Sequence, residues 1–199
     1  MKRLFIFIMG VMMAVAATSR TFDMKQLGAG AKGIKPCTKL INQTIEKAAS
    51  EGGGTIYFPA GTYLTATIHM KSNITLHLES GAIVRFSDRF EDYLPFVTAR
   101  WEGTVMQTLS PLIYAHSADN LTITGRGTLD GNGLKWWLWE FETRKVIKEN
   151  GGKLPSLDKL QQMWVDANKD LEISDYYKPS LERKMFRPPF IQFYECTNI

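Results

Sequence analysis

Between Gly52 and Val84, apolar and β-branched residues gather in short segments, and Gly, Pro, Asn or Ser closes each of them. Segments of this composition predict β-strands. The strands expected are Thr55–Phe58, Tyr63–Ile68 and Ile74–Leu78. The turn residues recur too closely for hairpins of ordinary length, so the pattern predicts a solenoid in which each coil lies parallel on the one before.

An internal match supports the solenoid. Pro111–Leu121 aligns without a gap to Pro189–Ile199. The identical positions are the two prolines, Ile113 with Ile191, and Asn120 with Asn198. Most other aligned positions keep their apolar or polar character, so the two segments are expected to occupy equivalent places in successive coils.

In both copies a polar residue and Asn precede an apolar strand start, and Ser72–Leu76 repeats this arrangement. Asn tolerates the left-handed backbone conformation that a sharp corner needs. Identical Asn side chains on stacked coils can also form a ladder of hydrogen bonds. We therefore expect Asn73, Asn120 and Asn198 to stack at one corner of the solenoid.

Thr38–Ser50 is predicted to be an amphipathic helix with Thr38 as its N-cap. Its apolar stripe consists of Ile41, Thr44, Ile45, Ala48 and Ala49. A single helix ahead of a solenoid most simply covers the open edge of the first coil. We therefore interpret the stripe as structural.

Residues 138–187 predict a helical insertion between two coils. Lys135–Glu149 has helical composition and is followed by Asn150, Gly151 and Gly152, a typical helix stop. Ser156 is expected to cap a second helix that reaches Val165. The apolar side of this helix would contain Leu157, Leu160, Met163 and Trp164.

The N-terminus has the pattern of a secretory signal peptide. Met1-Lys2-Arg3 is basic, Leu4–Ala17 is apolar, and Ala14-Val15-Ala16 fits the small-x-small cleavage pattern. The apolar segment is shorter than the roughly 20 residues that span a bilayer. We predict residues 1–17 to be the signal peptide, residues 18–199 to form one domain, and the mature protein to be secreted or periplasmic, without a membrane partner.

The formal net charge of +4 and the isoelectric point near 9.0 favour an anionic partner. An acidic polysaccharide is one partner of this kind, and no basic run or arginine-aromatic pattern of a nucleic-acid binder occurs. The spacing of Cys37 and Cys196 excludes a zinc cluster, and we predict no disulfide between them. Three isolated histidines, His69, His77 and His116, match no metal-site spacing.

Several motifs, in this order, resemble the N-terminal portion of glycoside hydrolase family 28, the polygalacturonases and rhamnogalacturonases. They are Gly52-Gly-Gly-Thr to Gly61-Thr-Tyr63, Ser72–Leu76, Arg100-Trp-Glu-Gly103, Ser110–Ile113, Asn120–Gly133 and Trp136-Trp137. The resemblance implies a pectin-lyase-type right-handed parallel β-helix with an N-terminal capping helix. It also implies a monomeric enzyme without a metal cofactor that hydrolyses uronic-acid-containing pectic chains with inversion.

The same resemblance implies three catalytic aspartates in Asn-Thr-Asp, Asp-Asp and Gly-His-Gly motifs, with an Arg-x-Lys that holds the substrate carboxylate. None of these motifs occurs in the sequence. Because Ile199 also falls inside a repeat, we expect a fragment without hydrolase activity. A polysaccharide lyase and a non-catalytic glycan-binding β-helix of the adhesin or tailspike kind remain alternatives.

Arg100, Trp101 and Glu102 are the candidate substrate-binding residues. An aromatic ring can stack on a sugar face while Arg and Glu bind hydroxyls or a carboxylate. The alternative is an Arg–Glu pair that holds a loop over a packed Trp101. Asp130 is interpreted as a turn residue, and Trp136, Trp137 and Trp139 as the place where the insertion docks, with a sugar-stacking platform as the alternative.

Overall fold

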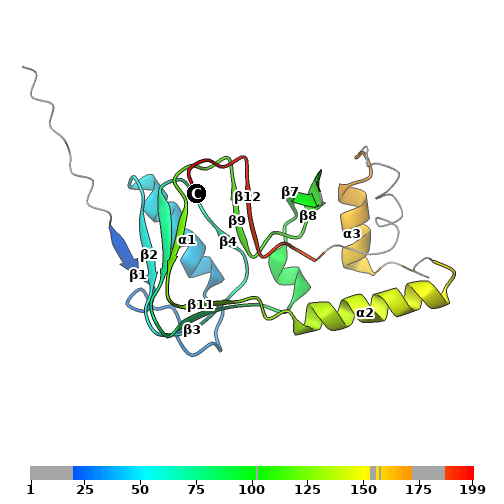
Figure 1. Ribbon diagram of the computed structural model, residues 1–199, viewed down its shortest axis with the longest axis horizontal. Coiled ribbons are helices and arrows are strands. Elements are labelled where there is room, and N and C mark those ends of the chain that lie inside the picture. Colours follow the sequence, from blue (N-terminus) through cyan, green and yellow to red (C-terminus); the bar gives the residue numbers. More distant parts are fainter. Residues whose placement is uncertain (1–19, 102, 153–155, 157, 172–186) are drawn as a thin grey trace, which may run out of the picture.

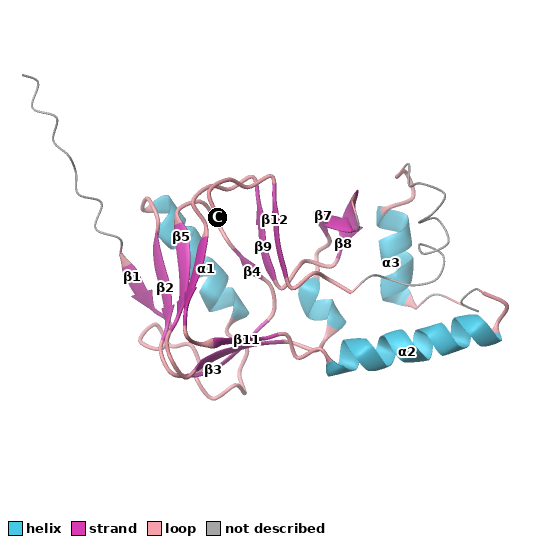
Figure 2. Ribbon diagram, in the orientation of Figure 1, coloured by secondary structure: helices cyan, strands magenta, loops and turns pink. Residues whose placement is uncertain are grey.

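The structure, a computed structural model, describes residues 20–199 except 102, 153–155, 157 and 172–186. Its body is a right-handed parallel β-helix, in which short strands of successive coils pair in parallel (Figures 1 and 2). The predicted solenoid is therefore confirmed. The predicted signal peptide, Glu102 and Leu157 lie outside the described residues, as do parts of the predicted insertion.

Three parallel sheets form the sides of the β-helix. The first has the order β1 (Thr21–Asp23), β2 (Gly54–Phe58), β5 (Ile74–Leu78) and β10 (Thr122–Gly125). The second has the order β11 (Thr128–Asp130), β6 (Ala82–Phe86) and β3 (Gly61–Thr65). The third has the order β12 (Ile191–Tyr194), β9 (Ile113–His116) and β4 (Ile68–His69). An antiparallel hairpin, β7 (Val97–Trp101) and β8 (Thr104–Thr108), lies outside these sheets.

The predicted strand Tyr63–Ile68 is wrong in one respect, because the structure divides it into β3 and β4. Ala66 and Thr67 make the corner between the second and third sheets. Both residues are buried and β-compatible, so composition alone gives no sign of the bend.

The inward side chains of the strands form a continuous apolar core. Those fully buried include Ile56, Phe58, Tyr63, Ile68, Ile74, Leu76 and Phe86. The rings of Phe58 and Tyr63 meet edge to face with centroids 5.2 Å apart, and the Tyr63 hydroxyl donates to the Pro59 carbonyl over 2.8 Å. Burial of each such side chain stabilises the fold by about 1.5–3 kcal/mol.

The three asparagines stack at one corner, as predicted. Asn73, Asn120 and Asn198 have φ values of 63°, 57° and 51°, in the left-handed region. The Asn120 amide donates to Asn73 Oδ1 over 2.7 Å, and the Asn198 amide donates to Asn120 Oδ1. The repeat that contains them is confirmed too, since Ile113 pairs with Ile191 in the register of β9 and β12.

Helix α1 (Thr38–Ser50) has the predicted bounds and packs against β2, β4 and β5. Its buried residues, Ile41, Thr44, Ile45 and Ala48, belong to the predicted stripe. The predicted N-cap is wrong, because Cys37 occupies the cap position without a side-chain hydrogen bond. The Thr38 hydroxyl instead accepts a hydrogen bond from the Ala66 N–H over 2.7 Å, which fixes the helix to the corner before β4.

The insertion contains the two predicted helices, α2 (Leu134–Glu149) and α3 (Lys159–Ala167). Asp158, not Ser156, caps α3, because its carboxylate accepts from the Gln161 N–H while Gln161 Oε1 accepts from the Asp158 N–H, both over 2.8 Å. Trp164 is fully buried, whereas Met163 is 41% exposed, contrary to the predicted apolar side.

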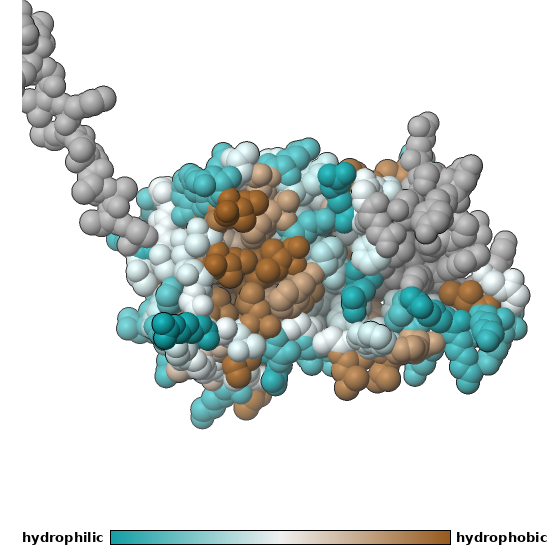
Figure 3. All heavy atoms as spheres, viewed as in Figure 1, coloured by the Kyte–Doolittle hydropathy of each residue, from teal (hydrophilic) through white to brown (hydrophobic). Residues whose placement is uncertain are grey.

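Helix α2 runs away from the β-helix along the long axis of the molecule (Figure 1). Apolar side chains gather on the molecular surface beneath its N-terminal half (Figure 3). Within the described part of the chain, no helix combines the length and apolar character that crossing a membrane requires.

Both cysteines are free thiols. Cys37 is buried and donates to the Leu64 carbonyl over 3.2 Å, and burial raises its pKa to about 11. Cys196 is only half-buried, whereas Ala118, its match in the repeat, is buried. The match to Ala118 predicts a small buried residue at position 196, and the structure agrees with this only in part.

Replacement of Asn120 tests the corner ladder. Asn120→Ala removes two side-chain hydrogen bonds, worth about 1 kcal/mol each. It also puts alanine, whose side chain cannot hydrogen-bond to the nearby backbone, in the left-handed region, at a further cost of about 1–2 kcal/mol. Asn120→Gly removes the same hydrogen bonds without that backbone cost. Urea unfolding should rank the free energies of unfolding as wild type, then Asn120→Gly, then Asn120→Ala. Equal stability of the three proteins would contradict the role of the ladder.

Candidate functional site

A pocket of about 440 Å³ lies where the second sheet passes into the insertion. Its walls combine aromatic, charged and amide side chains. The lining residues are Trp101, Leu112, Asp130, Gly131, Asn132, Gly133, Trp136, Arg187, Pro188, Pro189 and Phe190. These residues come from four segments, namely the β7–β8 hairpin, the residue before β9, the stretch from the end of β11 to the start of α2, and the stretch before β12. The pocket therefore joins parts of the chain that are distant in sequence.

Asp130 supplies the carboxylate of the pocket. It ends β11 directly beside Arg85 in the register of β11 and β6, and the Arg85 guanidinium donates to its carboxylate over 2.8 Å. The Asn132 N–H donates to the other carboxylate oxygen over 3.0 Å. The hydrogen bond from Arg85, followed by that from Asn132, lowers the Asp130 pKa. Asp130 is thus an ionised hydrogen-bond acceptor at neutral pH, and a poor proton donor.

Aromatic rings form the apolar wall. Trp136 is buried and stacks on Phe90, with centroids 4.0 Å apart and an interplanar angle of 27°. Phe90 belongs to a 3₁₀ helix, η1 (Phe90–Tyr93), and the Tyr93 ring meets Trp136 edge to face. Phe190 packs edge to face on Phe86 of the core and remains 40% exposed. These contacts hold the rings in place before any ligand binds.

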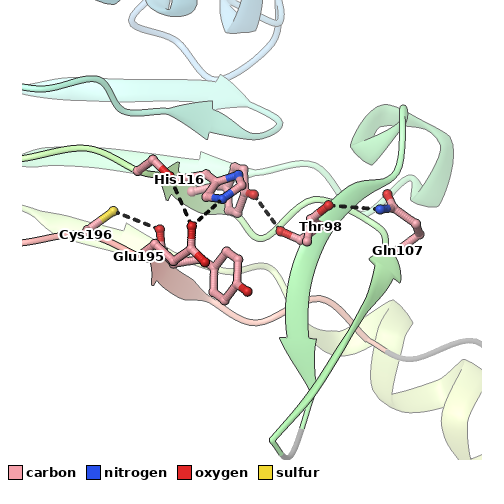
Figure 4. A network of polar contacts seen from close by, with 8 residues as sticks. Thr98, Gln107, His116, Glu195 and Cys196 are labelled. Atoms are coloured by element: carbon pink, nitrogen blue, oxygen red, sulfur yellow. Dashed lines mark hydrogen bonds and ion pairs between the residues drawn. The ribbon is translucent and has the colours of Figure 1, made fainter. Parts of the chain in front are cut away.

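The β7–β8 hairpin, which carries Trp101, is fixed to the third sheet by side-chain hydrogen bonds. The Tyr114 hydroxyl donates to the Thr98 carbonyl over 2.6 Å, while within the hairpin the Gln107 amide donates to Thr98 Oγ1 over 2.9 Å (Figure 4). The Gln192 side chain donates to the Arg100 carbonyl over 2.7 Å and accepts from the Arg100 N–H over 3.3 Å. The position of Trp101 is therefore set by strands β9 and β12.

Helix α3 holds the other strand of the hairpin. Asn168, which follows α3 and is buried, accepts from the Gln107 N–H and donates to the Gln107 carbonyl, both over 2.8 Å. This contact joins the two insertions of the β-helix. Nothing in the spacing around Asn168 predicts it, because the contact depends on how the two insertions fold.

The predicted site residues are brought together only in part. Trp101 is half-buried and lines the pocket, whereas Arg100 is exposed, and its guanidinium lies 3.4 Å from the Gly103 carbonyl, to which it donates. Glu102 lies outside the described residues. The substrate-binding role of Arg100, Trp101 and Glu102 stays a prediction.

Sequence reasoning did not find Phe190 or the Arg85–Asp130 pair as parts of the site. Phe190 could have been found, because the repeat aligns it with Leu112 and both line the pocket. The pairing of Arg85 with Asp130 depends on the register of β6 and β11. The sequences of these two strands show no internal match from which that register could be predicted.

The three tryptophans at the start of α2 differ in their surroundings. Trp136 is buried against η1, and Trp139 meets Phe90 edge to face with centroids 5.7 Å apart. Both are thus docking residues, as interpreted from the sequence. Trp137 is 54% exposed on the other side of the helix, where its ring lies 4.9 Å from that of Phe141.

The histidines are separated in space. His116 Nε2 lies 3.2 Å from Glu195 Oε2, which also accepts from the Ser117 hydroxyl (Figure 4). His69 is half-buried, its ring meets Tyr114 edge to face, and desolvation lowers its pKa. Among the described residues, no group of three His, Cys, Asp or Glu side chains is placed to hold a metal ion.

Comparison with known proteins finds relatives among the polygalacturonases. Residues 21–90 match the family model described as rhamnogalacturonase A/epimerase, pectate lyase-like. The chain is 28% identical over 133 residues to a probable polygalacturonase of Vitis vinifera, an alignment that covers 62% of this chain and 27% of the relative. It is 29% identical over 126 residues to an exo-poly-alpha-D-galacturonosidase of Dickeya chrysanthemi, covering 60% of this chain and 21% of the relative.

Two solved structures are similar as well. The exopolygalacturonase of Thermotoga maritima superposes with a TM-score of 0.67 at 33% identity, over 90% of this chain and 39% of that one. The family 28 exopolygalacturonase of Yersinia enterocolitica gives a TM-score of 0.50 at 29% identity, over 58% of this chain and 21% of that one. The chain spans about a quarter of the length of the curated relatives it matches. The predicted resemblance to family 28 polygalacturonases is confirmed.

Removal of Arg85 tests the electrostatics of the pocket. The folded-state pKa of Asp130 lies below its unfolded value of about 3.9, so the pair stabilises the fold above that pH and its contribution is lost as pH falls through the folded-state pKa. Arg85→Met should raise the Asp130 pKa, as measured by NMR titration of the carboxyl carbon. Because both side chains are partly exposed, the loss of stability at pH 7 should stay below about 1 kcal/mol, and it should disappear once the pH has fallen below the folded-state pKa of Asp130.

The control for this experiment is Arg89→Met, which removes a weaker pair with Asp92 at 3.8 Å on η1. It should leave the Asp130 titration unchanged. An Asp130 pKa that is the same in Arg85→Met and wild type would contradict the assignment.

Proposed function

We propose that this chain is the N-terminal part of a secreted, polygalacturonase-like glycoside hydrolase and that its pocket binds a uronic-acid-containing pectic chain. The observation that carries the proposal is the likeness to the exopolygalacturonase of Thermotoga maritima over 90% of this chain. The composition of the pocket supports it independently. Export is part of the proposal and rests on the basic and apolar pattern of residues 1–17.

The pocket has the chemistry that an acidic sugar requires. The half-buried Trp101 and the exposed part of Phe190 offer apolar surface for the C–H face of a sugar ring. Asn132 and the ionised Asp130 can bind ring hydroxyls, the carboxylate as acceptor only. Arg187 also lines the pocket, and its planar guanidinium can bind a uronate carboxylate through two hydrogen bonds.

The reaction itself needs more than this pocket contains. Inverting hydrolysis uses one carboxylic acid to protonate the leaving oxygen and a second carboxylate, roughly 6.5–9.5 Å away, to activate water. Asp130 is the one carboxylate among the described residues that line the pocket, and Arg85 keeps it ionised. Together with the missing aspartate motifs, this supports the proposal that the chain by itself is a binding module without hydrolase activity.

Binding of trigalacturonate by the purified chain tests this function. Isothermal titration calorimetry should detect binding by wild type, and Trp101→Ala should weaken it by about tenfold, the equivalent of about 1.4 kcal/mol. Val105→Ala is the matched control, because Val105 lies on the same hairpin and is exposed but does not line this pocket. A reducing-end assay on polygalacturonate should show no release by the chain alone.

Two results would contradict the proposal. Release of reducing ends by the pure chain would refute the assignment as a binding module. Equal affinity of wild type and Trp101→Ala for trigalacturonate, or no binding by either, would refute the assignment of the pocket.

A further inference from the structure

Helix α2 has a stripe of exposed side chains on the side that faces away from the β-helix. We call these residues the outer stripe. They are Leu134, Trp137, Leu138, Phe141, Lys145 and Lys148, and each lies three or four residues from at least one other member of the set. Residues at such spacings lie on one face of a helix. The exposed fractions of the first four are 72%, 54%, 52% and 57%, which is unusual for large apolar side chains.

The apolar half of the stripe is not needed to dock the helix. The opposite face of α2 makes that contact, through Trp136 on Phe90 and Tyr93 and through Trp139 on Phe90. In the outer stripe, the rings of Trp137 and Phe141 lie 4.9 Å apart at an interplanar angle of 38°. Both side chains are exposed, so the two rings form one aromatic surface on this face of α2.

The other half of the stripe is cationic. Lys145 and Lys148 are both exposed, and neither forms a salt bridge with any described residue. Glu142 and Glu149 lie beside the stripe, while the third acidic residue of the helix, Glu140, binds Arg144 over 2.6 Å. The two lysines are the charged residues of the stripe as defined, and Glu142 and Glu149 flank it, three residues before and four residues after Lys145.

The apolar and cationic halves of the stripe together favour one kind of ligand over others. A second copy of α2 would bury two lysines per helix at positions that a helix pair fills with apolar residues, at a cost in desolvation. A polyanion whose repeating unit has an apolar face matches both halves, because rings can stack on that face and lysines can attract the anionic groups. Uronic-acid polysaccharides have both features.

We infer that the outer stripe of α2 is a second binding site for acidic polysaccharide, separate from the Trp101 pocket. The inference rests on the proposed function for the class of ligand. From Leu134 to Lys148 the stripe is roughly 21 Å long, at about 1.5 Å per helical residue. It can therefore contact several sugar units of a long chain, whereas trigalacturonate is expected to occupy the pocket alone. Occupation of both sites would increase the affinity for long chains through effective concentration.

Affinities for two ligands, long polygalacturonate and trigalacturonate, test the inference in low salt. Lys145→Gln/Lys148→Gln and, separately, Trp137→Ala should each weaken polygalacturonate binding at least tenfold and leave trigalacturonate binding unchanged. The matched control is Lys39→Gln/Lys47→Gln, which removes the same charge from exposed positions of α1. It should change either affinity less than twofold. The lysine variant should also show a smaller dependence of polygalacturonate affinity on salt concentration.

The outcomes separate the stripe from the pocket. If both stripe variants bind polygalacturonate like wild type while Trp101→Ala loses trigalacturonate, the second site is refuted and the proposed function stands. The pocket and the outer stripe are both supported if Trp101→Ala loses trigalacturonate binding and the stripe variants lose only polygalacturonate binding. If the wild-type chain binds neither ligand, both are refuted. Sedimentation that shows a wild-type dimer and a Trp137→Ala monomer, with unchanged polygalacturonate affinity, would identify a second copy as the occupant and overturn the inference.

Discussion

The parallel hydrogen bonding between successive coils is the constraint on which the rest of the structure depends. Each strand is only two to five residues long, so it is stable only when its neighbours hold it in register. The left-handed asparagines at one corner fix that register by pairing side chain to side chain. Once the register is fixed, Asp130 has to lie beside Arg85 and Phe190 has to lie over Leu112, so the pocket is a consequence of how the coils stack.

The same stacking explains why two insertions meet at one place. In the first coil the chain passes from β3 to β4 through only Ala66 and Thr67. In the next two coils the equivalent corners are replaced by residues 87–112, with the β7–β8 hairpin, and by residues 131–190, with α2 and α3. Because equivalent corners of a solenoid lie above one another, both insertions leave the β-helix on the same side. Trp101 and Trp136 approach one pocket for this reason, and Asn168 fixes the two insertions together.

This arrangement also separates what could be predicted from the sequence from what could not. The repeat, the asparagine corner, helix α1 and the presence of two helices in the insertion follow from local composition and self-similarity, and the structure has all of them. The predicted caps of α1 and α3 are wrong because more than one side chain near each helix start can accept a hydrogen bond. The Thr38 hydroxyl binds the Ala66 N–H and not the helix backbone, and Asp158 caps α3 in place of Ser156. The pocket lay beyond sequence reasoning because its walls come from four segments whose contacts are all non-local. Of the predicted substrate-binding residues, only Trp101 could be placed there.

Helix α2 illustrates why patterns of apolar residues do not by themselves distinguish docking from binding. Apolar residues occupy two opposite faces of its N-terminal half, so the helix has no single apolar side to assign. The structure separates the faces: Trp136 and Trp139 contact η1, and Trp137 and Phe141 contact only each other among the described aromatic rings. A helix that needs one apolar face to dock and carries a second at the surface bears a solubility cost. That cost is offset where the second face binds a ligand, and the two lysines that continue it indicate that the ligand is an anion.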